Sequence, residues 1–276
     1  MAKQGGGRWL LRLDDLDSRR QQPGMADDIM RTLASFGLLW DGEVTRQSRH
    51  LEEYEAAFGA LQRAGEVYPC SCSRREISGS SSAPHPGDDG PAYPGRCRGG
   101  MNDSSPVRSW RVSVPEEEIC FTDRRRGECC QRLPAVCGDF VAKRGDGEFA
   151  YQLAVVVDDA LAGVNQVVRG DDLLGSTPRQ IYLQRLLDFP RPDYCHLPLV
   201  TGEGGAKLSK RDNLISNHLG SVAGREQVLL LAALRFLGQK PPPELSGEPC
   251  SAILQWGSDH FRPERLFAAV DGTVAA

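Results

Sequence analysis

The spacing of apolar and polar residues predicts alternating strands and helices in the first quarter of the chain. Residues 8–13 (R-W-L-L-R-L) form a predicted strand that ends in the acidic run 14–17. Apolar residues at helical spacing then predict one helix after Gly24 and another over residues 49–64, which ends at Gly65. This strand–helix–helix order is typical of an α/β domain with a parallel sheet.

The pattern changes between residues 68 and 144. Residues 78–90 are rich in Ser, Gly, Pro and Asp and show no periodicity, which predicts a loop. Short runs of β-forming residues follow at 109–114 and 119–122. We therefore expect an insertion of antiparallel character at this point.

Helix–strand alternation resumes after residue 144. The apolar, β-branched run 152–157 predicts a buried segment, but a run of this length fits a strand or a helix equally well. The remaining predictions are strands at 164–168 and 197–200 and helices at 176–187, 225–237 and 252–256.

The composition is that of a globular protein, with 276 residues, 40% hydrophobic and 25% charged. A formal net charge of −4 gives no overall basic field, so contacts with RNA would need local patches such as Arg124 to Arg126. We find no apolar run of membrane-spanning length and no signal peptide. Nine cysteines then indicate a reducing compartment, with thiols or metal and not a disulfide framework. We expect a cytoplasmic protein.

Three of the cysteines, Cys70, Cys72 and Cys97, bracket the predicted loop, and Tyr93 lies four residues before the last of them. Three thiols and a phenol oxygen could fold around one tetrahedral zinc ion. The Cys-x-Cys spacing is not the usual zinc-knuckle spacing, so free cysteines remain an equal alternative. The other six cysteines are interpreted as structural or incidental (120, 129, 130, 137, 195 and 250).

Charged and phenolic residues follow the predicted strands. Asp14, at the end of the first strand, could hold an ammonium group, although an acid there could equally serve the next helix as a cap. Tyr151 and Arg169 could together bind a carboxylate. The alternative for Arg169 is a structural ion pair with one of three acids (Asp159, Asp171 or Asp172).

A basic run, K-L-S-K-R at residues 207–211, follows a glycine-rich stretch. Two lysines with backbone N–H groups between them could surround a triphosphate. A basic patch on a solvated loop is the alternative, and the five residues alone favour it.

In combination, several motifs resemble the catalytic core of the bacterial glutamyl-tRNA synthetase family over about residues 6–266. These are R-W-L-L-R-L-D-D-L-D, Y-P-C-S-C-S-R, Y-P-G-R-C, F-A-Y-Q-L-A-V-V-V-D-D, V-V-R-G-D-D-L-L-G-S-T-P-R-Q, H-L-P-L-V and K-L-S-K-R. The similarity is greatest to the short paralogues of that family, which modify queuosine in tRNA(Asp).

The resemblance implies an α/β fold, a Rossmann-like class I synthetase core with a zinc-bearing insertion and a short C-terminal helical segment. The implied division is 1–67 and 145–220 for the two parts of the catalytic domain, 68–144 for the insertion and 221–276 for the helical segment.

The resemblance also implies roles for individual residues. It implies catalytic roles for Lys207, Ser209 and Lys210, with Lys210 on the ATP phosphates. Glutamate would be bound by Asp14, Tyr151 and Arg169, and Asp14 stands where the family usually has the longer glutamate. The implied ligands of one structural zinc ion are Cys70, Cys72, Tyr93 and Cys97.

The implied reaction joins L-glutamate to AMP, with Mg²⁺ carried by ATP, and then passes the glutamyl group to queuosine of tRNA(Asp). We expect a monomer with no membrane contact. The alternatives are a truncated enzyme that charges tRNA(Glu) and an inactive RNA-binding remnant.

The motifs begin after the family's first strand and its HIGH motif, neither of which we find in the chain. The missing strand would be central in the sheet, so we expect two strand edges without partners. We also expect this chain to aggregate or to fail in adenylate formation.

Overall fold

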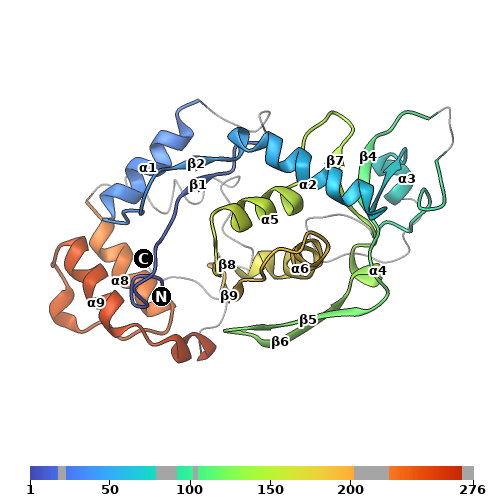
Figure 1. The fold of residues 1–276 in the computed structure, drawn as a ribbon. Coiled ribbons are helices and arrows are strands. Elements are labelled where there is room, and N and C mark those ends of the chain that lie inside the picture. The colour runs from blue at the N-terminus through green and yellow to red at the C-terminus, as the bar shows by residue number, and fades with distance from the viewer. Residues whose placement is uncertain (18–22, 79–91, 102–104, 202–223, 269–276) are drawn as a thin grey trace.

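The strands form three sheets in the computed structural model, which describes residues 1–17, 23–78, 92–101, 105–201 and 224–268 (Figure 1). None of the helices in these ranges is both long and apolar enough to span a membrane. The predicted four-part division of the chain remains a prediction.

The first sheet is a short parallel pair, β1 (Arg12–Leu13) and β2 (Thr45–Arg46), connected through helix α1 (Met25–Ser35). The predicted strand 8–13 forms a ladder only at its last two residues. Before them, the Trp9 and Leu11 carbonyls accept single bonds from the N–H groups of Asp41 and Thr45, so the chain runs alongside without a regular ladder.

Helix α2 (Leu51–Arg63) follows the 3₁₀ turn η1 (Gln47–Arg49), close to the predicted helix 49–64. It ends before Gly65, whose φ of +76° is a left-handed conformation that glycine adopts without strain. Four of its residues are buried, at the spacing of one helix face, namely Tyr54, Ala57, Phe58 and Leu61.

The insertion has the predicted antiparallel character. Strands β3 (Val67–Cys70), β4 (Ser109–Val112) and β7 (Phe140–Arg144) form the second sheet in that order. Strands β5 (Glu118–Asp123) and β6 (Gly127–Arg132) form a hairpin. The sequence reasoning missed β6, β7 and the short helices α3 (Arg74–Ser78) and α4 (Leu133–Val136).

The β5–β6 hairpin places Cys120 directly opposite Cys130, and a disulfide joins them. Of the two interpretations given for these cysteines, structural or incidental, the disulfide supports the structural one, but the expectation of thiols or metal in place of a disulfide was wrong for this pair. Their pairing follows from the antiparallel register, which cysteine spacing alone does not define.

The third sheet has the order β6-β5-β9-β8, with β8 (Gln166–Gly170) and β9 (Asp193–Leu197) parallel to each other. The predicted strand 197–200 was misplaced, because β9 ends where that prediction begins. Within the described ranges β1 has a ladder partner only in β2 and β8 only in β9. The expectation of two strand edges left by a missing strand remains a prediction.

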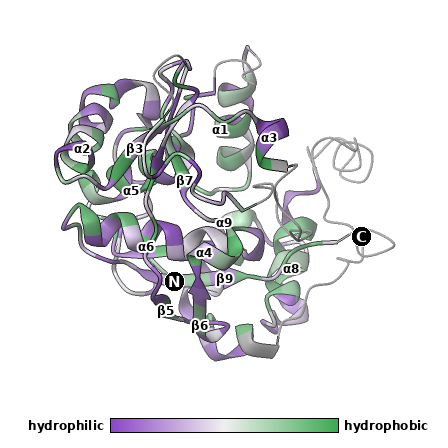
Figure 2. Cartoon of the chain, turned by 90° about the vertical axis from the view of Figure 1, so that its right-hand side faces the viewer, coloured by the Kyte–Doolittle hydropathy of each residue, from purple (hydrophilic) through white to green (hydrophobic). Residues whose placement is uncertain are grey.

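The ambiguous apolar run is helix α5 (Tyr151–Leu161). It packs against α2 on one side and against α6 (Thr177–Leu186) on the other (Figure 1). Residues 152–158 are all buried, so the helix has no polar face that would give the sequence a 3.6-residue period. By contrast, α2 at the surface alternates hydrophilic and hydrophobic residues (Figure 2).

Helices α8 (Glu226–Phe236) and α9 (Cys250–His260) pack together near α1 (Figure 1). The remaining elements of the described ranges are 3₁₀ segments, namely η2 (Asp171–Ser176), η4 (Pro243–Leu245) and η5 (Pro263–Ala268). Gly37, just after α1, has a φ of +74°, and a Cβ there would lie 3.3 Å from the Leu254 side chain of α9. The left-handed backbone at this position favours glycine, and a larger residue would also need the Leu254 side chain to shift slightly.

Leu153→Ala should lower the free energy of unfolding by about 2–5 kcal/mol, because it leaves a cavity around a fully buried side chain of α5. Leu161→Ala, on the same helix, is the control, since Leu161 is 56% exposed and should cost less than about 1 kcal/mol. Urea denaturation followed by circular dichroism measures both. Equal losses would contradict the position of α5 in the core.

Candidate active site

Arg12 joins two carboxylates at the end of β1. Its Nε donates to Asp14 Oδ1 at 2.8 Å and its Nη1 to Asp159 Oδ1 at 2.7 Å. The Asp14 side chain is 44% exposed, so one carboxylate remains open to a ligand while the guanidinium fixes its position. Helix α1 begins only at Met25 after Gly24, so Asp14 is not its cap.

Beneath this pair lies the buried carboxylate of Asp158, in α5. It accepts hydrogen bonds from Gln47 Nε2 at 2.8 Å, His50 Nδ1 at 2.7 Å and the Tyr54 hydroxyl at 2.8 Å. Its Oδ2 also lies 3.5 Å from Arg12 Nε. One carboxylate therefore connects η1, α2, α5 and β1 under the site.

Tyr151 is the first residue of α5 and is 39% exposed. Partial burial raises the pKa of its phenol, the charges of Arg169 and Arg12 act in the opposite direction, and Asp14 acts in the same direction. Both other predicted site residues, Asp14 and Arg169, thus lie within electrostatic reach of Tyr151. Burial likewise raises the pKa of Asp159, against the opposing effect of both arginines.

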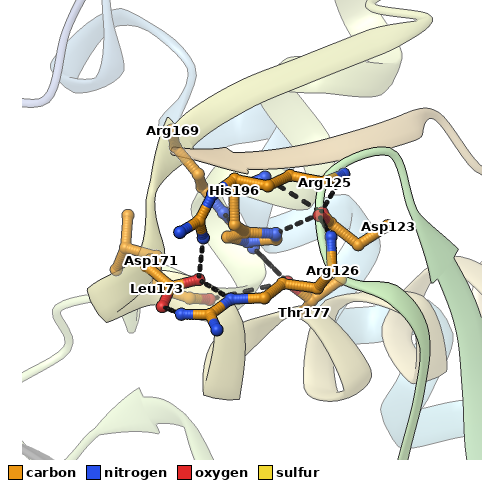
Figure 3. Close-up of polar contacts among 8 residues, drawn as sticks. All are labelled: Asp123, Arg125, Arg126, Arg169, Asp171, Leu173, Thr177 and His196. Carbon is orange, nitrogen blue, oxygen red and sulfur yellow. Dashed lines mark hydrogen bonds and ion pairs between the residues drawn. The ribbon is translucent and has the colours of Figure 1, made fainter. Parts of the chain in front are cut away.

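Arg169, near the end of β8, makes no ion pair with an acid in the part of the chain that the structure describes. Its Nε donates to His196 Nε2 at 3.1 Å and its Nη2 to the Thr177 hydroxyl at 2.7 Å (Figure 3). Asp171, one of the acids considered as its partner, pairs with Arg126 instead. No carboxylate in the described ranges lies within ion-pair distance of Arg169, so its Nη1 keeps N–H donors for an anionic ligand.

The residues that hold Arg169 were missed by sequence reasoning. Thr177 begins α6, His196 lies in β9, and Asp123 ends β5. His196 and Thr177 lie in two of the quoted motifs, H-L-P-L-V and V-V-R-G-D-D-L-L-G-S-T-P-R-Q, but sequence reasoning gave neither of them a role. The predicted phosphate-binding residues Lys207, Ser209 and Lys210 lie outside the described residues.

The cysteine cluster forms as predicted at the end of β3. The Tyr93 hydroxyl lies 3.3 Å from Cys70 Sγ and 3.6 Å from Cys72 Sγ, and Cys72 Sγ lies 3.7 Å from Cys97 Sγ. Two zinc–sulfur bonds at the tetrahedral angle would require about 3.8 Å between sulfurs, and a sulfur and an oxygen ligand about 3.5 Å. The four side chains therefore fit one tetrahedral metal ion.

The surroundings of the cluster favour the thiolate form of Cys97, whereas burial raises the pKa of Cys72. Arg111 Nε lies 3.4 Å from Cys70 Sγ, and the guanidinium lies 3.9 Å from the centre of the Tyr93 ring. Burial raises the pKa of Cys97, but hydrogen bonds with Tyr93, the Ser71 backbone and the other two thiols together lower it to about 7. Thiolates are the metal-binding form of cysteine.

Solved structures share this fold. A glutamate tRNA ligase from Elizabethkingia meningosepticum, in complex with its amino acid, superposes with a TM-score of 0.77 at 21% identity, over 100% of this chain and 62% of its own. A glutamate-tRNA synthetase from Elizabethkingia anophelis superposes with a TM-score of 0.78 at 21% identity, over 99% of this chain and 63% of its own. The chain thus spans less than two thirds of these structures. The fold is the class I tRNA synthetase catalytic fold.

The family profile for class I tRNA synthetases (E and Q), catalytic domain, matches residues 1–246. The chain belongs to this family, as the motifs indicated. A glutamyl-Q tRNA(Asp) synthetase of Geobacter sulfurreducens is 56% identical over 96% of this chain and 85% of its own length. One of Dechloromonas aromatica is 47% identical over 94% of this chain and 85% of its own.

Asp158→Asn should lower the free energy of unfolding by about 3 kcal/mol, because an amide cannot accept from three donors and no longer balances Arg12. Glu116→Gln is the matched control, since Glu116 is 78% exposed in its pair with Arg132 and should change stability by less than about 1 kcal/mol. Urea denaturation compares the two variants. A loss no larger than that of Glu116→Gln would contradict the linking role of Asp158.

Proposed function

We propose that the chain activates L-glutamate with ATP and transfers the glutamyl group to queuosine of tRNA(Asp). The observation that carries the proposal is the separation of charge in the site. Arg169 keeps donors for a carboxylate, while Asp14 offers an exposed acid for an ammonium group. An amino acid with a carboxylate side chain matches both. The names of the relatives at 44–56% identity support glutamate and tRNA(Asp) in particular.

In the proposed first step, an oxygen of the glutamate α-carboxylate attacks the α-phosphorus of ATP, and pyrophosphate leaves. Arg169 and the Tyr151 hydroxyl hold a substrate carboxylate, and Asp14 holds the ammonium group, so the site contributes mainly by positioning. Lys207, Ser209 and Lys210 stabilise the ATP phosphates, whose charge Mg²⁺ also reduces. Asp14 is one methylene shorter than glutamate, so its ammonium contact is longer or passes through water.

In the second step, a queuosine hydroxyl attacks the activated carbonyl and AMP leaves. The acceptor distinguishes this proposal from the charging of tRNA(Glu) at its 3′ end. A tRNA acceptor places the reaction in the cytoplasm. We further propose that the chain acts as a monomer.

We propose that Cys70, Cys72, Tyr93 and Cys97 hold one structural Zn²⁺. The distances among their sulfur and oxygen atoms support this ion, because they match those of a closed tetrahedral site. Such an ion would connect β3 to the segment around Cys97, on the far side of a long loop in sequence, and so stabilise the insertion.

The purified protein should carry about one equivalent of zinc, and Cys72→Ser should lose it, because the remaining donors no longer close the site. Tyr93→Phe should release zinc to a chelator faster than the unmodified protein. Elemental analysis and a colorimetric zinc assay measure these quantities. Cys250→Ser, in α9, is the control and should keep the metal. An unchanged zinc content in Cys72→Ser would contradict the proposed ligand set.

Radiolabelled glutamate with ATP should label tRNA(Asp) that contains queuosine, and neither unmodified tRNA(Asp) nor tRNA(Glu). Arg169→Lys should reduce kcat/KM for glutamate by about 10- to 100-fold, because lysine loses the planar pair of donors. Arg185→Lys, exposed on α6, is the matched control. The Geobacter sulfurreducens relative serves as positive control. Label on tRNA(Glu) alone, or on no tRNA while the relative is active, would contradict the proposed function. The second result is the one that the expected failure of adenylate formation predicts.

A further inference from the structure

Asp123 is buried behind Arg169 and its carboxylate is fully used. The side chains of Asp123 and His196 both have 0% exposure. Asp123 Oδ2 accepts from the His196 backbone N–H at 3.0 Å and from Nδ1 at 2.7 Å. Oδ1 accepts from the backbone N–H groups of Arg125 at 2.9 Å and Arg126 at 2.8 Å. The turn after β5 therefore fixes this carboxylate in one orientation.

The contacts of His196 define its protonation. Asp123 can only accept, so Nδ1 carries a proton. Arg169 can only donate, so Nε2 at 3.1 Å from Arg169 Nε must present its lone pair. His196 is therefore neutral, with the proton on Nδ1, and it connects a buried anion to the cation at the site.

This arrangement differs from that of an ordinary buried histidine. A purely structural pair with Asp123 would leave Nε2 to the backbone or to a neutral group. Here Nε2 accepts from Arg169, which takes part in the proposed binding of glutamate, and it also contacts the Thr177 hydroxyl. The Thr177 hydroxyl accepts from Arg169 Nη2 at 2.7 Å and itself lies 3.1 Å from His196 Nε2. Two fixed acceptors on different elements define the plane of the guanidinium (Figure 3).

We propose that His196, oriented by Asp123, is a positioning residue that holds the Arg169 guanidinium in the plane in which it receives the substrate carboxylate. This inference rests on the proposed role of Arg169 in glutamate binding. A protonated His196 would turn an N–H toward the guanidinium and displace it, so the device works only while the imidazole is neutral.

The surroundings of His196 keep it neutral. Burial is the largest effect and lowers the pKa of His196, and the positive charge of Arg169 lowers it further. The carboxylates of Asp123 and Asp171 raise the pKa but do not cancel the effect of burial. The charged groups that face it are Asp123 and the following arginines from β5, Arg169 from β8 and Asp171 from η2, while α6 contributes the uncharged Thr177. Because the pKa is lowered by folding, the stability contributed by neutral His196 is present above pH about 6.5 and is lost as pH falls through the folded-state value.

Two substitutions of His196 separate its two hydrogen bonds. In His196→Asn, the amide nitrogen replaces Nδ1 and still donates to Asp123, but nothing reaches Arg169. In His196→Gln, the side-chain oxygen reaches the position of Nε2 and accepts from Arg169, without a titrating group. We expect His196→Asn to raise KM for glutamate by about 10- to 100-fold with little change in kcat or in KM for ATP. His196→Gln should remain within about threefold of the unmodified protein.

The acid limb of the pH profile is the second measurement. KM for glutamate in the unmodified protein should rise only at pH values below the ordinary histidine pKa of about 6.5, because folding lowers the pKa of His196, and His196→Gln should remove that rise. Tyr194→Phe is the matched control, since Tyr194 is 2% exposed on the same strand and loses only its hydrogen bonds with Gln184. It should lower stability and leave KM unchanged. An effect of His196→Asn no larger than that of Tyr194→Phe, in folded protein, would overturn the proposal.

A third measurement does not depend on glutamate activation. The ¹⁵N shifts of His196 in the ligand-free protein should report the Nδ1–H form. The Arg169 Nε–H signal should exchange slowly with solvent in the unmodified protein and in His196→Gln, and rapidly in His196→Asn. The proposal would be overturned if His196 carried its proton on Nε2, or if the exchange rate of the Arg169 Nε–H were the same in both variants. If these signatures hold while no glutamate activity is found, the fault lies with the proposed function.

Discussion

The site depends on the cost of burying carboxylates. Asp158 and Asp123 are both excluded from water, and an ionised carboxylate in that environment must be met by donors. The donors come from segments far apart in sequence, with Gln47, His50 and Tyr54 meeting Asp158 and the turn after β5 and His196 meeting Asp123. Satisfying these two charges therefore fixes how α2, α5, β5 and β9 come together.

Each buried aspartate also controls one arginine of the site. Asp158 lies 3.5 Å from Arg12, which fixes Asp14 at the surface. Asp123 acts through His196 on Arg169. Asp14 and Arg169 are therefore each held in place by a separate buried aspartate, and the two do not pair with each other. Asp14 is paired with Arg12 but keeps an exposed carboxylate, and Arg169 has no acid partner within the described residues, so each can still meet a ligand group of opposite charge.

The elements that the sequence predicted best are the amphipathic helices and those with clear end signals. Helix α2 shows its buried face in the spacing of Tyr54, Phe58 and Leu61, and Gly65 marks its end. Prediction failed where tertiary contacts replace a local pattern. Helix α5 is buried on every side, so it has no period, and β9 was misplaced because its partner in β8 lies 27 residues earlier, at Arg169 opposite His196.

The sequence by itself determined the family and the chemistry available to it, because residue types in a fixed order are a property of the chain. It determined the zinc-ligand candidates and the trio Asp14, Tyr151 and Arg169 in the same way. Only the tertiary structure decided what holds those residues. In the structure Arg169 donates hydrogen bonds to His196 and Thr177 instead of pairing with an acid. A disulfide joins Cys120 to Cys130. Strand register and the packing of distant segments make those choices, and neither has a local signature in the sequence.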